Sequence, residues 1–149
     1  MGIMPIVMLT QKTLEYLTSI GWFSGRAIDT SEYTSLLLKY QIVPHQYALT
    51  FYSEFGNLKG HQIRDKNMWF KFKLDDDEYM GEFIKFIVEI NEEFNLKLIP
   101  VGVGYYDVLI DSKGDLYYYF EGDLSQAGIG MYDSIEKFLN AKYIKSINW

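Results

Sequence analysis

The residues that most often perform acid–base, nucleophilic or metal chemistry are few in this chain, and they do not form a catalytic pattern. The sequence has two histidines, no cysteine, and neither an HExxH nor a GxSxG motif. His45 starts an expected helix and His61 lies in an expected strand, where a lone histidine usually serves packing or the surface. Gly102 and Gly104 lack the third glycine and the following helix of a dinucleotide site. We therefore predict no catalytic residue, no metal site and no cofactor.

Acidic residues are the other candidates for acid–base chemistry, and they concentrate between residues 75 and 93. Eight acids face Lys85 alone there, a net of −7, whereas the rest of the chain sums to +1. A pair such as Asp75 and Glu78 would need an apolar pocket to separate its pKa values, and nothing in the sequence indicates one. Acids before a helix also cap its free N–H groups, and those along it commonly form a solvated face.

Trp69 is the aromatic residue that we expect to be exposed. It falls on the polar side of a predicted strand, beside Lys71 and Lys73. An indole at such a position contributes little stabilisation unless something covers it. The cover could be a helix of the same domain or a partner, and the sequence does not decide between these alternatives. A basic partner would be attracted to the nearby acids. The hypothetical partner-binding residues are Trp69, Asp75, Asp76, Asp77, Glu78 and Glu82.

The segment 21–26 combines two glycines, an indole and a guanidinium directly after a predicted helix. Glycine permits positive-φ turns, tryptophan adds an apolar plate, and arginine offers five fixed donors. No nucleophile–base pair accompanies them. We therefore expect Trp22, Gly25 and Arg26 to shape the fold, with Arg26 bonding backbone carbonyls or Asp29.

Length and composition predict one soluble domain spanning residues 1–149, with 48% apolar and 23% charged residues. Residues 1–9 lack the basic start and cleavage site of a signal peptide, so we interpret them as a flexible or mis-started N-terminus. No stretch approaches the roughly 18–20 apolar residues of a membrane span. Zero cysteines suit a reducing cytoplasm, and the acidic balance disfavours nucleic acid. We expect a cytoplasmic monomer or weak homo-oligomer without membrane or nucleic-acid contacts.

Helical signals fill the N-terminal third of the chain. Thr10 caps the first predicted helix. Asp29 opens the second, where Asp29 and Glu32 are spaced as a capping box. Pro44 at the N1 position begins the third helix, and Gly56 ends it. Three helices are therefore expected before the first strand.

The apolar pattern then changes its period. Alternation over 68–74 predicts a half-buried strand that pairs with 58–63 through a turn at 64–67. A helix follows, then further strands and a last helix, at 79–94, 97–101, 106–111, 116–120 and 133–141. We predict an α+β fold: one domain with a mainly antiparallel sheet of about four to six strands, and N-terminal, inserted and C-terminal helices packed on it.

The order of the turn-forming motifs resembles the SUKH superfamily, and within it the third subgroup. The motifs that carry the resemblance, from about Thr13 to Asn140, are Gly21-Trp22, Gly25-Arg26, Ile28-Asp29, Phe55-Gly56, Pro100-x-Gly102 and Asp111-Ser-Lys-Gly114-Asp115. Two departures are Phe23-Ser24, where a proline or charged residue is expected, and Val103-Gly104, where polar residues are expected. The resemblance gives Phe55, Gly56, Pro100 and Gly102 a structural role.

The resemblance implies a bacterial immunity protein, which binds and silences a polymorphic or contact-dependent toxin encoded beside it. Many such toxins are nucleases, and an acidic, aromatic-rich inhibitor suits the basic cleft that such enzymes present. The expected partner is therefore a protein toxin with a basic surface. Two alternatives stay open: a general interaction or scaffolding module of the SUKH type, and, with less support, a small hydrolase or lyase.

Overall fold

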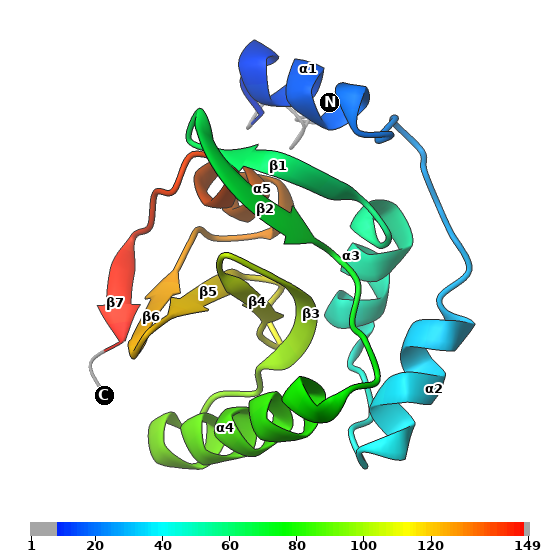
Figure 1. Cartoon of the computed structure of the whole chain (residues 1–149), viewed down its shortest axis with the longest axis vertical. Helices are drawn as coiled ribbons and strands as arrows, with labels where there is room; N and C mark the ends of the chain where they lie inside the picture. The colour runs from blue at the N-terminus through cyan, green and yellow to red at the C-terminus, as the bar shows by residue number, and fades with distance from the viewer. Residues whose placement is uncertain (1–8, 148–149) are drawn as a thin grey trace, which may run out of the picture.

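Within residues 9–147, seven antiparallel strands form one sheet, in which each strand pairs with the next along the chain (Figure 1). The computed structural model describes residues 9–147. The strands are β1 (Lys59–Ile63), β2 (Lys66–Lys71), β3 (Ile99–Gly104), β4 (Asp107–Ile110), β5 (Leu116–Phe120), β6 (Asp123–Gln126) and β7 (Lys145–Ile147). The predicted fold class is confirmed, but the estimate of four to six strands was too low. The unpredicted strands are β6 and β7, which have four and three residues.

Five helices surround this sheet: α1 (Gln11–Ser19), α2 (Ser31–Lys39), α3 (Gln46–Phe55), α4 (Glu78–Phe94) and α5 (Met131–Leu139). Helix α1 lies beside the β1–β2 hairpin, and α4 lies at the opposite end of the molecule (Figure 1). Within residues 9–147, no helix is both long enough and apolar enough to cross a membrane. The suggested flexible N-terminus falls largely on residues 1–8, which are outside the described part of the chain.

The two faces of the sheet are covered by different helices. Phe70 and Tyr118 both lie edge-on to Phe138 of α5, with ring centroids 5.8 and 5.6 Å apart. On the opposite face, Tyr119 of β5 packs against Phe86 of α4 with a centroid distance of 4.2 Å. Side chains alternate along a strand, so this change from Tyr118 to Tyr119 also changes the face. Helix α4 is therefore separated from α5 by the sheet.

The predicted helix start is correct for α1 and differs from the observed start by one or two residues for α2, α3, α4 and α5. The Thr10 hydroxyl caps α1 by accepting from the N–H of Thr13. Helix α2 begins at Ser31 after Thr30, so Asp29 does not form the expected capping box; its carboxylate accepts from the N–H of Ser31 instead. Such a local side-chain bond competes with the cap.

His45, and not Pro44, sets the start of α3. The imidazole Nδ1 accepts from the N–H of Ala48, 3.1 Å away, which makes His45 the N-cap. Pro44 therefore precedes the helix and is not its N1 residue. Proline fits this position because it favours an extended backbone before the cap.

The β1–β2 hairpin turns in two residues, Arg64 and Asp65, and the expected turn at 64–67 was too long. Both residues have positive φ, 54° and 61°, as a type I′ turn requires. Glycine and asparagine usually occupy such turns. Because neither stands at these two positions, the sequence did not reveal the two-residue turn. The N–H of Arg64 donates to the carbonyl of Leu139 and connects the hairpin to the end of α5.

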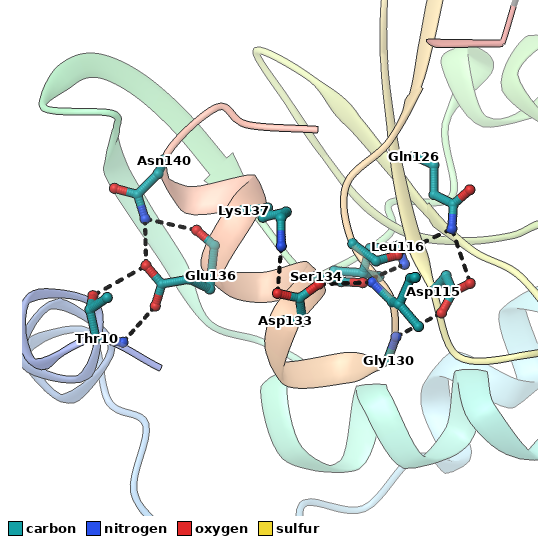
Figure 2. A network of polar contacts seen from close by, with 12 residues as sticks. Thr10, Asp115, Leu116, Gln126, Gly130, Asp133, Ser134, Glu136, Lys137 and Asn140 are labelled. Carbon is teal, nitrogen blue, oxygen red and sulfur yellow. Dashed lines mark hydrogen bonds and ion pairs between the residues drawn. The ribbon is translucent and has the colours of Figure 1, made fainter. Parts of the chain in front are cut away.

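Polar contacts anchor α5 at both of its ends (Figure 2). Glu136 accepts a hydrogen bond from the N–H of Thr10, which ties α5 to the start of α1, and another from the side-chain amide of Asn140 at the end of α5. At the other end, the Asp115 carboxylate accepts from the side chain of Gln126 and from the N–H of Gly130. The first helix, the last helix and the β5–β6 pair are thus held in one unit.

Candidate partner-binding surface

Two side chains of the turn after α1, those of Trp22 and Arg26, bond to the end of α3. Trp22 is 6% exposed, and its Nε1 donates to the Glu54 carboxylate at 3.0 Å. The Arg26 guanidinium donates to the carbonyls of Glu54 and Gly56 at 2.6 and 2.8 Å. Burial lowers the pKa of Arg26, and the nearby Glu54 charge opposes that shift. Gly25 turns the chain between them with a φ of +86°.

The other motif residues also lie in the interior. Phe55 is fully buried and its ring is parallel to that of Trp22, with centroids 6.4 Å apart. A side chain on Gly56 would collide with the carbonyl oxygen of Tyr52, and one on Gly102 with that of Lys71. The Pro100 carbonyl accepts from the buried hydroxyl of Tyr33 at 2.8 Å. These residues position α2, α3 and β3.

Trp69 is a predicted contact residue that is accessible to a partner, because half of its surface is exposed. It lies on β2, two residues from Lys71 and therefore on the same face of that strand. The ammonium of Lys71 pairs with Asp75 at 2.5 Å. The indole and the start of the acidic segment are thus brought onto one side of the sheet, the side that α4 covers.

The first three acids of the segment are already bonded within the chain. Asp75 pairs with Lys71, and Asp76 pairs with Lys39 of α2 while accepting from the Tyr40 hydroxyl at 2.7 Å. Hydrogen bonds from Lys39 and Tyr40 lower the pKa of Asp76. Asp77 is the N-cap of α4, because its carboxylate accepts from the N–H of Met80.

The outward side of α4 carries acids with less internal bonding. Glu78, Glu82 and Glu89 recur at helical spacing along it and are exposed. Glu82 approaches Lys85 at 4.0 Å, a weak surface pair. Among the described residues, no hydrogen bond or ion pair engages the carboxylates of Glu78, Glu89, Glu92 and Glu93. Acids without an internal partner therefore lie at the start of α4 and along its C-terminal half.

The buried carboxylates form structural networks that do not resemble a catalytic site. Asp107 accepts from the Tyr79 hydroxyl, and burial raises the pKa of Asp107. Asp111 accepts from the N–H groups of Lys113 and Asp115, which closes the β4–β5 hairpin. Across residues 9–147, no group of three or more acidic, histidine or cysteine side chains is placed to hold a metal ion.

Two features of this surface were not predicted from the sequence. The Tyr79–Asp107 contact joins residues from α4 and β4, and no spacing rule connects them. An apolar groove of about 370 Å³ lies beside α4, where Val88 is 46% exposed. Ile87 belongs to the apolar stripe of α4 that faces the core, and Val88 lies one residue outside that stripe. This apolar residue on the outer side was the only sign of the groove in the sequence.

Comparison with known proteins gives one match. The family model described as SUKH-3 immunity protein matches residues 9–140, which is most of the chain. No curated protein and no solved structure matches this chain. The matched range includes every strand except β7 and all five helices.

Proposed function

Because the chain belongs to the SUKH-3 immunity protein family, we propose that it binds a cognate bacterial toxin and neutralises it by stoichiometric occlusion. The proposed toxin is a nuclease or another enzyme that modifies nucleic acid. The chain would act in the cytoplasm as a monomer or weak homo-oligomer, without catalysis and without contacting nucleic acid itself. The role follows from the family, and the class of toxin from the chemistry of the surface.

Two observations support the class of toxin: the acidic outer side of α4, and an exposed indole, Trp69 of β2, on the face of the sheet that α4 covers. An enzyme that acts on nucleic acid presents a basic cleft, so its field and that of α4 are complementary. Tryptophan is enriched among residues that dominate binding energy, and half-exposed Trp69 is available for such a contact. We propose that the contact surface comprises Trp69, Asp75, Asp76, Asp77, Glu78 and Glu82.

The test is co-expression with the toxin encoded beside the chain. The proposal expects restored growth of toxin-producing cells and recovery of a stable one-to-one complex. Trp69→Ala should weaken that complex about tenfold or more without unfolding the chain, because its side chain is half exposed. Absence of both rescue and complex would contradict the immunity role and favour a scaffolding module.

A further inference from the structure

The apolar groove beside the C-terminal half of α4 has features of a second contact site. Its walls come from the α2–α3 connection, from α4 and from the segment that enters β3, and include Ile42, Val43, His45, Ile87, Val88 and Leu96. Val43 is 78% exposed and Val88 is 46% exposed. Two valines that remain in solvent on facing walls of a groove gain free energy when a ligand covers them.

The charged residues next to the groove indicate which kind of ligand would fit it. Glu92 lies four residues after Val88, on the same side of α4, and Glu89 is adjacent to it on the outward side. Neither carboxylate makes an ion pair or hydrogen bond within the described chain. Lys97 is the cation that lines the groove, at the end where the chain leaves α4. The ligand that fits is apolar on one side and basic on the other.

His45 adds a donor without an acceptor to the groove wall. Its Nδ1 accepts from the N–H of Ala48, so the ring proton is on Nε2. That Nε2 is buried and has no hydrogen-bond partner among the described residues. Buried polar groups are nearly always satisfied, so a carbonyl from a bound segment is a suitable acceptor at this wall.

From these observations we propose that the groove binds a basic segment of the toxin, which inserts apolar side chains between Val43 and Val88 and places its cations over Glu89 and Glu92. This inference rests on the proposed function, because it assigns the occupant to the toxin. Helix α4 then contributes both an acidic face and an apolar anchor to one interface. The 17 residues of α4 extend over about 25 Å, within the span of a standard interface.

The absence of cysteine from the sequence allows a direct footprint. Val43→Cys and, as a matched control on the β6–α5 connection, Ile129→Cys place single thiols at residues that are 78% and 69% exposed. Both variants should fold normally, because neither side chain is part of the core. Alkylation of each is measured with and without an equimolar, catalytically inactivated form of the adjacent toxin.

We expect the toxin to slow alkylation of Val43→Cys at least about tenfold and to leave Ile129→Cys nearly unchanged. In parallel, Val88→Asp should weaken the complex about tenfold, the equivalent of about 1.4 kcal/mol. If the wild-type chain binds the toxin but Val43→Cys stays reactive and Val88→Asp binds normally, the groove is not part of the toxin interface. That outcome would leave the immunity role intact. If the wild-type chain does not bind the toxin, the proposed function fails, and the groove's assignment fails with it.

Discussion

Arg26 shows how a residue that suggests binding chemistry instead fixes the backbone. Its guanidinium donates to two carbonyls at the end of α3, those of Glu54 and Gly56. The fork geometry suits two acceptors at once, and a lysine ammonium cannot reproduce it. The sequence left backbone carbonyls and Asp29 open as acceptors for Arg26, and in the structure the acceptors are the carbonyls.

We expect Arg26→Lys to lower the free energy of unfolding by roughly 1–3 kcal/mol, since at least one buried carbonyl loses its charged donor. Urea denaturation measures the change. Arg64→Lys, a substitution of the same type at an exposed residue, should stay within about 0.5 kcal/mol. Equal effects of the two substitutions would show that the carbonyl contacts of Arg26 add little to stability.

Asp107 gives the fold a pH dependence of opposite sign to that of Asp76, a surface acid paired with Lys39. Burial raises its pKa, so the folded chain holds this proton to a higher pH than the unfolded chain does. Stability is therefore lost as the pH rises from the unfolded pKa to the folded one, and it stays lost at neutral pH. Asp76 behaves oppositely, because its lowered pKa gives stability that is lost as the pH falls through the folded pKa.

Asp107→Asn removes the buried charge and keeps an oxygen that can accept from Tyr79. We expect the variant to be more stable than the wild type at neutral pH by on the order of 1 kcal/mol, and this advantage should shrink in mildly acidic buffer. Denaturant titrations at both pH values measure the difference. Asp76→Asn is the opposite-sign control: it should destabilise at neutral pH. An advantage of Asp107→Asn that grows on acidification would contradict the assigned sign.

At the scale of elements, local signals predicted α1, α4 and β5 well, and tertiary contacts decided the rest. Thr10 and Asp77 are side-chain caps whose chemistry is readable from the sequence. Strand β6 is too short to show an alternating pattern, and it exists because β5 and β7 pair with it on both sides. The groove is a product of the α2–α3 connection folding against α4, which no local pattern encodes.

Asp77 tests whether the acidic segment stabilises α4 or only attracts a partner. Asp77→Ala removes the acceptor for the N–H of Met80 and should lower the free energy of unfolding by about 1 kcal/mol. Asp77→Asn retains a capping oxygen and should recover most of that loss. Glu82→Ala, on the exposed side of the same helix, should change stability by less than about 0.5 kcal/mol. Thermal or urea unfolding distinguishes these cases, and equal losses for Asp77→Ala and Asp77→Asn would exclude the cap.

At the scale of the whole molecule, the charge is polarised: α4 lies at one end of the fold, and α1 with the β1–β2 hairpin lies at the other (Figure 1). Screening over about 8 Å at physiological salt means that the two ends act separately on an approaching partner. The α4 end carries most of the net charge of −6 and joins its acids to the exposed side chains of Tyr79 and Val88. Steering by this end should therefore depend on where the acids lie and not only on their total.

Two double substitutions with the same change in net charge separate these possibilities. Glu78→Gln with Glu82→Gln removes two negative charges from the α4 end, and Glu15→Gln with Asp65→Asn removes two from the opposite end. Asparagine tolerates the positive φ of 61° at position 65. In stopped-flow association with the toxin, the α4 pair should slow binding severalfold and flatten its salt dependence, while the remote pair should change little. Equal slowing by both pairs would mean that the total charge steers the encounter, and the acidic side of α4 would then have no special part in it.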